Sequence, residues 1–214
     1  MSYKYILFYS YKRPKNLPMY VNIPDYKVDE IKGFLTPDEC DLIIKMASPK
    51  MSDSYTYRDN KTQLNISTRK SKTCVLWNDT KWIYNRLSEY LPMIKNHSNE
   101  SLQVSSYEKG GYFRNHYDAC VGEEDDCRKM DGYYGPRLLT CLIYLNDDYE
   151  GGDTFFPIIN KKINPQKGKA IIFQDTDKKG SIIRESLHTG TDVKEGHKWI
   201  ATIWVRKLKR YFEF

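Results

Sequence analysis

The chain has 214 residues, which allows one domain with a substantial core and makes a second full domain unexpected. Apolar residues make up 40% and charged residues 29%, as is ordinary for a globular protein. The net charge of +6 is mild and the basic residues are scattered, whereas nucleic-acid-binding proteins usually concentrate their basic charge, so no nucleic-acid partner is expected.

The first segment, residues 1–30, is basic and rich in Tyr and Pro, and it is predicted to be an extended arm or an edge strand. Its opening apolar stretch is short and has no small-residue cleavage site after it, so neither a signal peptide nor a membrane span is expected. The chain ends without an endoplasmic-reticulum retention tetrapeptide. A cytoplasmic location is therefore the default expectation; the oligomeric state is left open, and a monomer is plausible.

Two helices are predicted before residue 100. The first begins in TPDECDLIIKMA, where Thr36 can cap the helix, Pro37 takes the first helical position and Glu39 closes a capping box. It is expected to end near Ser48. The second helix is predicted over about residues 80–94, where apolar side chains recur at helical spacing.

From residue 101 onward the sequence changes to short β-type runs separated by Gly, Asp and Pro. The runs are SLQVSSYE, RLLTCLIYLN, DTFFPI, KAIIFQD, SIIRESLH and KWIATIWVRK. Two helices followed by this many strands predict an α+β protein, with a curled sheet or barrel backed by helices. The polar loop over residues 119–136 is long enough to be a lid or substrate loop.

Five cysteines at irregular spacing suggest neither a zinc site nor a disulfide framework. Cys120 and Cys127 are close enough in sequence to bridge, but free thiols in a reducing compartment are the favoured expectation.

A candidate metal site lies in FRNHYDA, where His116 stands two residues before Asp118. On a strand, residues i and i+2 project from the same face, so the imidazole and the carboxylate would converge. A distant histidine, such as His188 at the end of a β-type run, would complete a two-His, one-carboxylate set of the kind used by non-haem Fe(II) oxygenases. A bare His-x-Asp motif is weak evidence, and a surface or core histidine is the alternative.

The last β-type run, KWIATIWVRK, has an unusual polar face. Period-2 alternation places five side chains on that face: Lys198, Ile200, Thr202, Trp204 and Arg206. Such a face is poor filling for a barrel but suits a cavity for a dicarboxylate, with the Lys198 ammonium on the far carboxylate. The alternative is an edge strand whose polar face meets water.

From about Arg69 to Arg206 the sequence resembles the prolyl 4-hydroxylase family, most closely the collagen-type and plant or algal enzymes. The matching segments, in family order, are RKSKTCVL, LQVSSYEKGGYFRNHYDA, RLLTCLIYLNDDYEGGDTFFP, PQKGKAIIF, SLHTGTDVKEGHKW and ATIWV. The resemblance implies a double-stranded β-helix (jelly-roll) core over about residues 101–207, backed by N-terminal helices, within a catalytic domain at residues 31–214.

The resemblance also implies the roles of individual residues. It implies that His116, Asp118 and His188 bind Fe(II), and that Lys198 pairs with the C5 carboxylate of 2-oxoglutarate. The other positions that match the co-substrate pocket are Tyr107, Thr140, Tyr144 and Thr202. The positions that match contacts to the peptide substrate are Arg69, Arg137 and Trp204.

Three positions depart from the family pattern or complicate it. Arg206 stands where several relatives have His, which predicts a different substrate groove. Phe113 stands where the family often has Tyr, which removes one hydroxyl near the iron. Strict alternation would place Arg137 on the opposite face from Thr140, so its role requires the strand to begin after it.

The implied reaction is hydroxylation of a peptidyl proline with Fe(II), O2 and 2-oxoglutarate, giving hydroxyproline, succinate and CO2, with L-ascorbate as supporting reductant. The substrate is a proline-containing peptide or protein, with collagen-like repeats as one option. Three alternatives stay open: hydroxylation of lysine or of a ribosomal-protein proline, nucleic-acid demethylation, and ligand binding by a β-barrel without turnover. Lys198 disfavours the lysyl and demethylase readings, because those enzymes hold 2-oxoglutarate with arginine.

Overall fold

The computed structural model describes residues 18–58, 61–63, 66–77, 80–120, 131 and 135–207. The first part of the predicted N-terminal arm and most of the loop predicted to be a lid lie outside the described residues. Within the described chain, no helix is long and apolar enough to cross a membrane.

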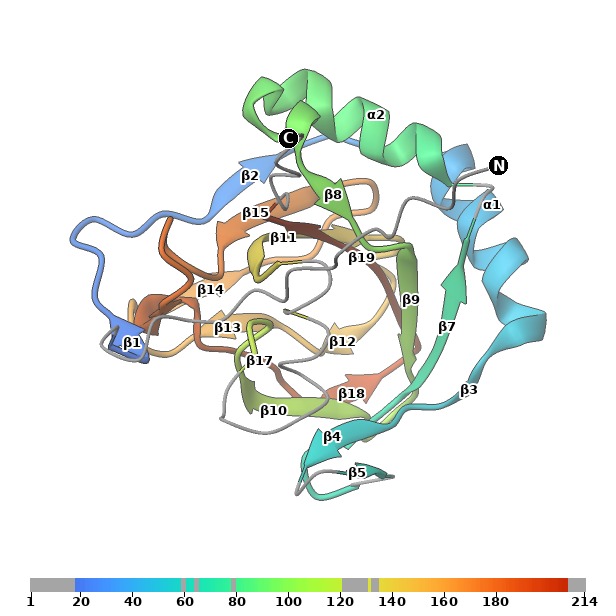
Figure 1. Cartoon of the computed structure of the whole chain (residues 1–214). Coiled ribbons are helices and arrows are strands. Elements are labelled where there is room, and N and C mark those ends of the chain that lie inside the picture. The colour runs from blue at the N-terminus through green and yellow to red at the C-terminus, as the bar shows by residue number, and fades with distance from the viewer. Residues whose placement is uncertain are drawn as a thin grey trace, which may run out of the picture.

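The larger of two facing sheets has eight strands, and every pairing within it is antiparallel (Figure 1). In spatial order they are β2 (Asp29–Ile31), β15 (Ala170–Gln174), β11 (Arg137–Tyr144), β19 (Lys198–Arg206), β9 (Leu102–Tyr107), β7 (Lys72–Leu76) and β3 (Ser52–Asp53), with β8 (Ser98–Asn99) also pairing with β19. Residues 29–31 therefore form an edge strand of this sheet.

The smaller sheet has five strands and lies across from the larger one (Figure 1). Its order is β14 (Lys161–Ile163), β13 (Thr154–Phe156), β17 (His188–Gly190), β10 (Tyr112–His116) and β6 (Arg69–Lys70). Within the described residues, the remaining strands form three two-stranded pairs: β1 (Tyr20–Val21) with β16 (Ile182–Ile183), β12 (Glu150–Gly151) with β18 (Val193–Glu195), and β4 (Thr56–Arg58) with β5 (Lys61–Gln63). The two facing sheets form the predicted jelly-roll core.

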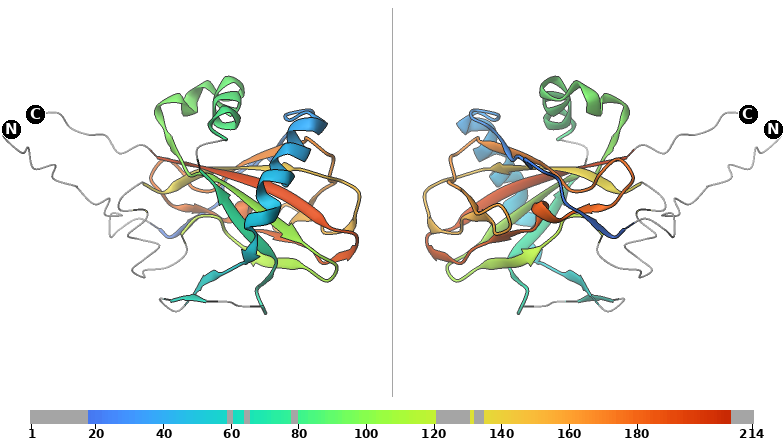
Figure 2. Two further views of the ribbon diagram at one scale, coloured as in Figure 1. Left: turned by 90° about the vertical axis from the view of Figure 1, so that its right-hand side faces the viewer. Right: turned by 90° about the vertical axis from the view of Figure 1, so that its left-hand side faces the viewer.

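Two helices, α1 (Pro37–Ala47) and α2 (Lys81–Tyr90), cover the outer face of the larger sheet (Figure 2). Three short 3-10 turns, η1 (Ser48–Lys50), η2 (Pro92–Asn96) and η3 (Arg184–Ser186), lie in the connections. The helices and strands share one core, in which Ile43 and Leu87 pack with Ile143 and Ile203 of the sheet. The predicted α+β class, with helices backing a β core, is confirmed.

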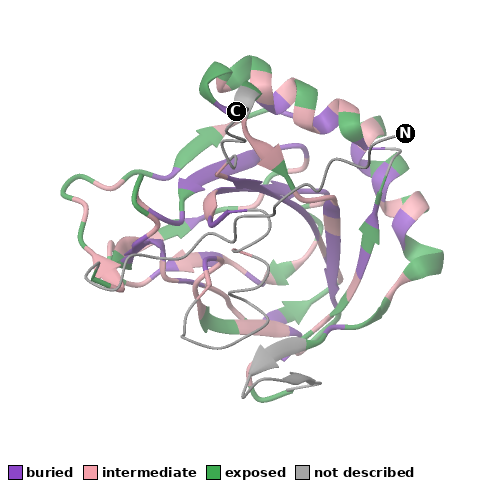
Figure 3. Ribbon diagram, viewed as in Figure 1, coloured by how far each residue is buried: buried purple, intermediate pink, exposed green. Residues whose placement is uncertain are grey.

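The pleat of the larger sheet separates two cores. Along β11, Cys141 and Ile143 point to the helices, whereas Leu142 and Tyr144 belong to a second core between the sheets. The central strands are accordingly buried on both faces, the helices alternate between buried and exposed residues, and the edge strands β2 and β3 contain no buried residue (Figure 3). The space between the sheets is where a site can form.

The first helix begins as its sequence predicts. The Thr36 side chain accepts a hydrogen bond from the Glu39 amide, and the Glu39 carboxylate accepts one from the Thr36 amide. Glu39 also pairs with both terminal nitrogens of Arg86 on α2, at 2.6 and 2.7 Å. The cap therefore ties the start of α1 to the second helix.

The second helix is shorter than predicted. It ends at Tyr90, and η2 follows from Pro92 instead of a continuous helix to Ile94. Pro92 has no amide proton to donate and disfavours a helical conformation at Leu91, so the α-helix stops before it.

We expect Thr36→Ala to lower the free energy of unfolding by about 1 kcal/mol, because it leaves the Glu39 amide without its acceptor. For a chain of this size that corresponds to a fall in Tm of roughly 2–4 °C. Differential scanning calorimetry measures it. Thr36→Ser keeps the hydroxyl and should match the wild type; equal Tm values for the Ala and Ser variants would show that the cap contributes nothing.

Candidate active site

Three potential metal ligands meet at one end of the smaller sheet. His116 is the last residue of β10 and His188 is the first of β17, and the antiparallel pairing sets these two residues opposite each other. Asp118 lies beyond the end of β10, in a bend. His116 and Asp118 do converge, as predicted, but the predicted cause, alternation along one strand, is wrong. The strand ends at His116, and the bend that follows brings Asp118 to the same point.

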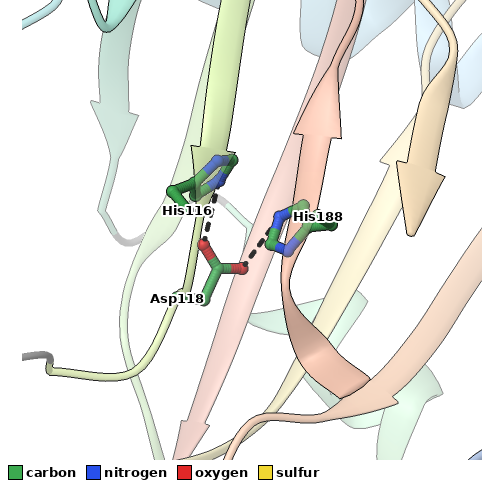
Figure 4. A group of neighbouring side chains, drawn as sticks. All are labelled: His116, Asp118 and His188. Atoms are coloured by element: carbon green, nitrogen blue, oxygen red, sulfur yellow. Dashed lines mark ion pairs between the residues drawn. The ribbon is translucent and has the colours of Figure 1, made fainter. Parts of the chain in front are cut away.

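The three side chains point toward one another (Figure 4). One ligand atom from each lies within 4.8 Å of the others. His116 Nε2 is 3.6 Å from Asp118 Oδ1, and His188 Nε2 is 3.9 Å from Asp118 Oδ2. Two imidazoles and one carboxylate on one side of a point are the donor set that suits a divalent first-row metal such as Fe(II) with open coordination positions.

Backbone carbonyls fix the tautomer of both histidines. His116 Nδ1 lies 2.8 Å from the Arg114 carbonyl oxygen, and His188 Nδ1 lies 2.9 Å from the Ser186 carbonyl oxygen. A carbonyl oxygen can only accept a hydrogen bond, so each Nδ1 carries a proton. Nε2 is then the ring nitrogen of each histidine that is left to bind a metal. Burial, with the neighbouring His188, lowers the pKa of His116 to about 3, so its imidazole is neutral at physiological pH.

Asp118 supplies the negative charge of the group. Burial raises its pKa, but His188, His116 and Arg137 outweigh that effect and bring the pKa to about 2. Arg137 also donates through Nη1 to the Asp118 carbonyl oxygen at 2.8 Å. The carboxylate therefore stays ionised throughout the neutral range.

The three donors open onto a cavity of about 730 Å3 between the sheets. All five residues predicted to share one face of the last strand line it: Lys198, Ile200, Thr202, Trp204 and Arg206. The strand that carries them, β19, is central in its sheet, with β11 on one side and β9 on the other. The alternative of a polar edge strand facing water is wrong.

Lys198 is buried in the wall of this cavity, 2% exposed. Its ammonium donates to the Gly152 carbonyl oxygen at 2.7 Å and lies 5.3 Å from the centroid of the Tyr107 ring. Burial lowers the pKa of Lys198 to about 8, although Asp153 acts in the opposite direction. The Gly152 carbonyl is the hydrogen-bond acceptor of this ammonium among the described residues, and a carboxylate bound in the cavity would take the donors that remain.

The structure places the four other predicted co-substrate residues in two groups. Tyr107 and Thr202 line the cavity, as expected. Thr140 and Tyr144 are buried behind the cavity wall, not among its lining residues. The Tyr144 hydroxyl donates a hydrogen bond to Thr154, which does line the cavity, and the Thr140 hydroxyl donates one to Asp118. Both hydroxyls are therefore bonded to other side chains of the protein.

The three predicted substrate residues, Arg69, Arg137 and Trp204, all line the cavity. For Arg137 this position was predicted only if the strand began after it. Strand β11 in fact begins at Arg137, and the side chain still reaches the cavity. The register against β19 shifts between Arg137 and Leu139, so an extra residue in the strand turns Arg137 to the cavity face. Its guanidinium lies 3.8 Å from the centroid of the Trp204 ring.

Phe113 and Arg69 form a stack on one of the candidate ligands. The Phe113 ring lies parallel to the His116 imidazole with 3.5 Å between centroids, and the Arg69 guanidinium lies 4.6 Å from the Phe113 centroid. Arg69 donates to the hydroxyls of Ser71 and Ser105. The side chain that departs from the family pattern thus packs directly on the site.

Sequence reasoning missed the carboxylates that hold the cavity arginines. Glu100 accepts two hydrogen bonds from Arg137, at 2.6 and 2.8 Å, and one from Arg206, at 2.7 Å. Arg206 also donates to Asp131 at 2.9 Å. Glu100 precedes β9 and Asp131 lies far along the chain, so no local pattern marks them; only the two arginines, already singled out, hint that acidic partners exist.

The expectation of free thiols is wrong for Cys120, which is disulfide-bonded. Cys127 lies outside the described residues. Cys40, Cys74 and Cys141 are free and buried. Cys120 also lines the cavity, two residues after Asp118, so the bond restrains the chain next to the site.

Known proteins resemble this chain in sequence and in structure. A family model for the 2OG-Fe(II) oxygenase superfamily matches residues 102–206. A putative prolyl 4-hydroxylase of Acanthamoeba polyphaga mimivirus is 30% identical over 202 residues, covering 89% of this chain and 79% of that protein. Probable prolyl 4-hydroxylase 3 of Arabidopsis thaliana is 30% identical over 201 residues, covering 81% and 67%.

Solved structures agree with these relatives. The viral collagen prolyl hydroxylase of Paramecium Bursaria Chlorella virus-1, in its 2OG complex, superposes with a TM-score of 0.67 at 29% identity, covering 86% of this chain and 98% of that one. A Trichoplax adhaerens prolyl hydroxylase in complex with a hypoxia inducible factor peptide shares the fold, with a TM-score of 0.61 at 18% identity over 85% and 84% of the two chains.

We expect His116→Ala, Asp118→Ala and His188→Ala each to weaken binding of a divalent metal at least ~100-fold, because a three-donor site that loses one donor loses both affinity and geometry. Anaerobic isothermal titration calorimetry with Co(II) measures the affinity. His97→Ala and His197→Ala are the controls, since neither histidine lines the cavity. A site variant that binds Co(II) like the wild type would remove that residue from the ligand set.

Proposed function

This chain belongs to the prolyl 4-hydroxylase family of the 2OG-Fe(II) oxygenase superfamily, and we propose that it hydroxylates a peptidyl proline with Fe(II), O2 and 2-oxoglutarate. One observation supports this function most directly. A two-His, one-carboxylate donor set and a buried lysine with donors to spare open onto the same cavity. Bound Fe(II) and 2-oxoglutarate would supply the O2 chemistry that yields hydroxyproline, succinate and CO2.

In this proposal the protein provides position and charge. His116, Asp118 and His188 would hold the metal through Nε2, a carboxylate oxygen and Nε2, and the backbone carbonyls on both Nδ1 atoms fix the orientation of the imidazoles. Lys198, at the start of β19, would take the remote carboxylate of 2-oxoglutarate. Burial deprives the Lys198 ammonium of water, and hydrogen bonds to the bound carboxylate would compensate for that loss.

The substrate side of the cavity suits a peptide. The Trp204 indole and the Arg137 guanidinium stack at 3.8 Å and give an aromatic and cationic surface for a proline ring and its neighbouring carbonyl groups. Arg137 and Arg206 are paired with Glu100 and Asp131, so they do not offer free charge to a phosphate backbone. We therefore propose a proline-containing peptide as substrate, not a nucleic acid, with L-ascorbate as the supporting reductant.

The direct experiment is mass spectrometry of peptides incubated with the protein, Fe(II), 2-oxoglutarate and ascorbate. The panel should contain poly-proline, collagen-like Gly-X-Pro repeats, single-proline loops and matched peptides with lysine in place of proline. We expect a gain of one oxygen on proline, coupled to succinate formation, and none with Asp118→Ala. Oxygen gained only on lysine would identify a different target, and no decarboxylation of 2-oxoglutarate with any peptide would favour a binding protein.

We expect Lys198→Ala to raise the KM for 2-oxoglutarate at least ~30-fold, the equivalent of about 2 kcal/mol for a buried charge pair that loses one partner. Lys198→Arg should fall between Ala and wild type, because the guanidinium keeps the charge but is longer and planar. Initial-rate kinetics over a 2-oxoglutarate series measure the effect. An unchanged KM in Lys198→Ala would place the co-substrate elsewhere.

The same lysine predicts a pH dependence. Because burial brings the pKa of Lys198 to about 8, the free protein loses this charge as the pH rises through that value. The KM for 2-oxoglutarate should therefore rise above pH 8 in the wild type. Lys198→Arg stays protonated and should show no such rise; an equal rise in both proteins would assign the effect to another group.

A further inference from the structure

One buried acidic residue has no part in the proposed function so far. Asp175 follows directly after β15 and is completely buried. Its Oδ2 lies 2.8 Å from Thr140 Oγ1, and Thr140 Oγ1 lies 2.8 Å from Asp118 Oδ2. One hydroxyl thus bridges a candidate metal ligand and a second carboxyl group.

The number of protons in this chain of three groups decides its chemistry. A threonine hydroxyl has one proton and can donate to only one of the two carboxyl oxygens. Two ionised carboxylates would leave the other 2.8 Å contact between lone pairs, with no proton in it. A second proton must therefore lie on Asp175 or on Asp118.

The surroundings place that proton on Asp175. Arg137 donates to Glu100 and to the Asp118 carbonyl, and Tyr26 donates to the Gln174 carbonyl, so neither gives a hydrogen bond to Asp175. Asp175 Oδ1 has no hydrogen-bond partner among the described residues. A buried carboxylate anion with one oxygen left without a donor is strongly destabilised, whereas the carbonyl oxygen of a neutral acid is destabilised far less.

The groups around Asp175 shift its pKa in both directions. Burial is the largest effect and raises the pKa of Asp175 well above its usual value, and the Asp118 charge adds to this; the hydrogen bond with Thr140 and the Arg137 charge lower it, and Glu100 raises it.

We propose that Asp175 is an uncharged carboxylic acid that positions Asp118 through Thr140. The Asp175 O–H donates to Thr140 Oγ1, and the Thr140 hydroxyl donates to Asp118 Oδ2. This relay fixes the rotation of the Asp118 carboxylate and leaves Oδ1 facing His116. The inference rests on the proposed function, since it gives Asp175 and Thr140 the task of orienting a metal ligand.

The relay orients the Asp118 carboxylate, as the backbone carbonyls orient the two imidazoles. Each imidazole is held by a main-chain carbonyl, which no substitution removes, whereas Asp118 Oδ2 is held by side chains. Groups that orient a metal ligand typically contribute about 10- to 100-fold to metal affinity. The relay can therefore be tested one group at a time.

The test compares Co(II) affinity by anaerobic calorimetry, and the Co(II) absorption spectrum, across Asp175→Asn, Asp175→Leu, Thr140→Val and Thr140→Ser. An amide can donate to Thr140 as the acid does, so Asp175→Asn should bind Co(II) within about threefold of the wild type. Asp175→Leu and Thr140→Val break the relay and should bind about 10- to 100-fold more weakly with an altered spectrum. Thr140→Ser should restore most of the loss.

Infrared spectroscopy gives a readout that a packing role would not change. The wild type minus Asp175→Asn difference spectrum should contain the carbonyl stretch of a protonated carboxylic acid at neutral pH. Its absence, or an Asp175→Asn affinity as weak as that of Asp175→Leu, would show that Asp175 acts as an anion and would overturn the proposal. If Asp175→Leu does not fold, Thr140→Val and Asp175→Asn decide the question between them.

The outcomes also separate this inference from the proposed function. If Asp118→Ala abolishes Co(II) binding while Thr140→Val binds like the wild type, only the relay is wrong. If Asp118→Ala binds Co(II) like the wild type, the metal site itself is wrong, and the relay is rejected with it.

Discussion

Strands β11 and β19 pair along their length at the centre of the larger sheet, and the pleat of that pair divides the protein into two environments. On one face, side chains such as Ile143 and Ile203 pack under the helices. On the other face, Lys198 and Thr202 line the cavity. The polar face is held rigid because its reverse face is anchored in an apolar core.

The charges in the cavity follow from this division. Burial leaves the Lys198 ammonium poorly solvated, and the pKa of Asp118 is held low by the neighbouring histidines and Arg137. Two arginines of the cavity, Arg137 and Arg206, are paired with Glu100 and Asp131. The free protein thus leaves two charges incompletely paired in its cavity, which are the two that a metal ion and a dicarboxylate would complete.

Much of this could be read from the chain because several patterns are local. The capping box at Thr36 and Glu39 needs only neighbouring residues, and the polar face of β19 needs only the two-residue repeat of a strand. Other expectations failed where the chain departs from regular geometry. Asp118 is placed by a bend after its strand, Arg137 by an extra residue in β11, and the second helix is cut short by Pro92.

The sequence by itself determined the kinds of groups present: the metal donor set, the lysine for an anion, the α+β class and the likeness to prolyl 4-hydroxylases. Only the tertiary structure decided which partner each group has. It set Thr140 on Asp118 instead of in the cavity, brought Glu100 to two arginines, and buried Asp175 within reach of Thr140. The physical reason is that hydrogen bonds between residues far apart in the chain depend on strand register and side-chain direction, which no local pattern records.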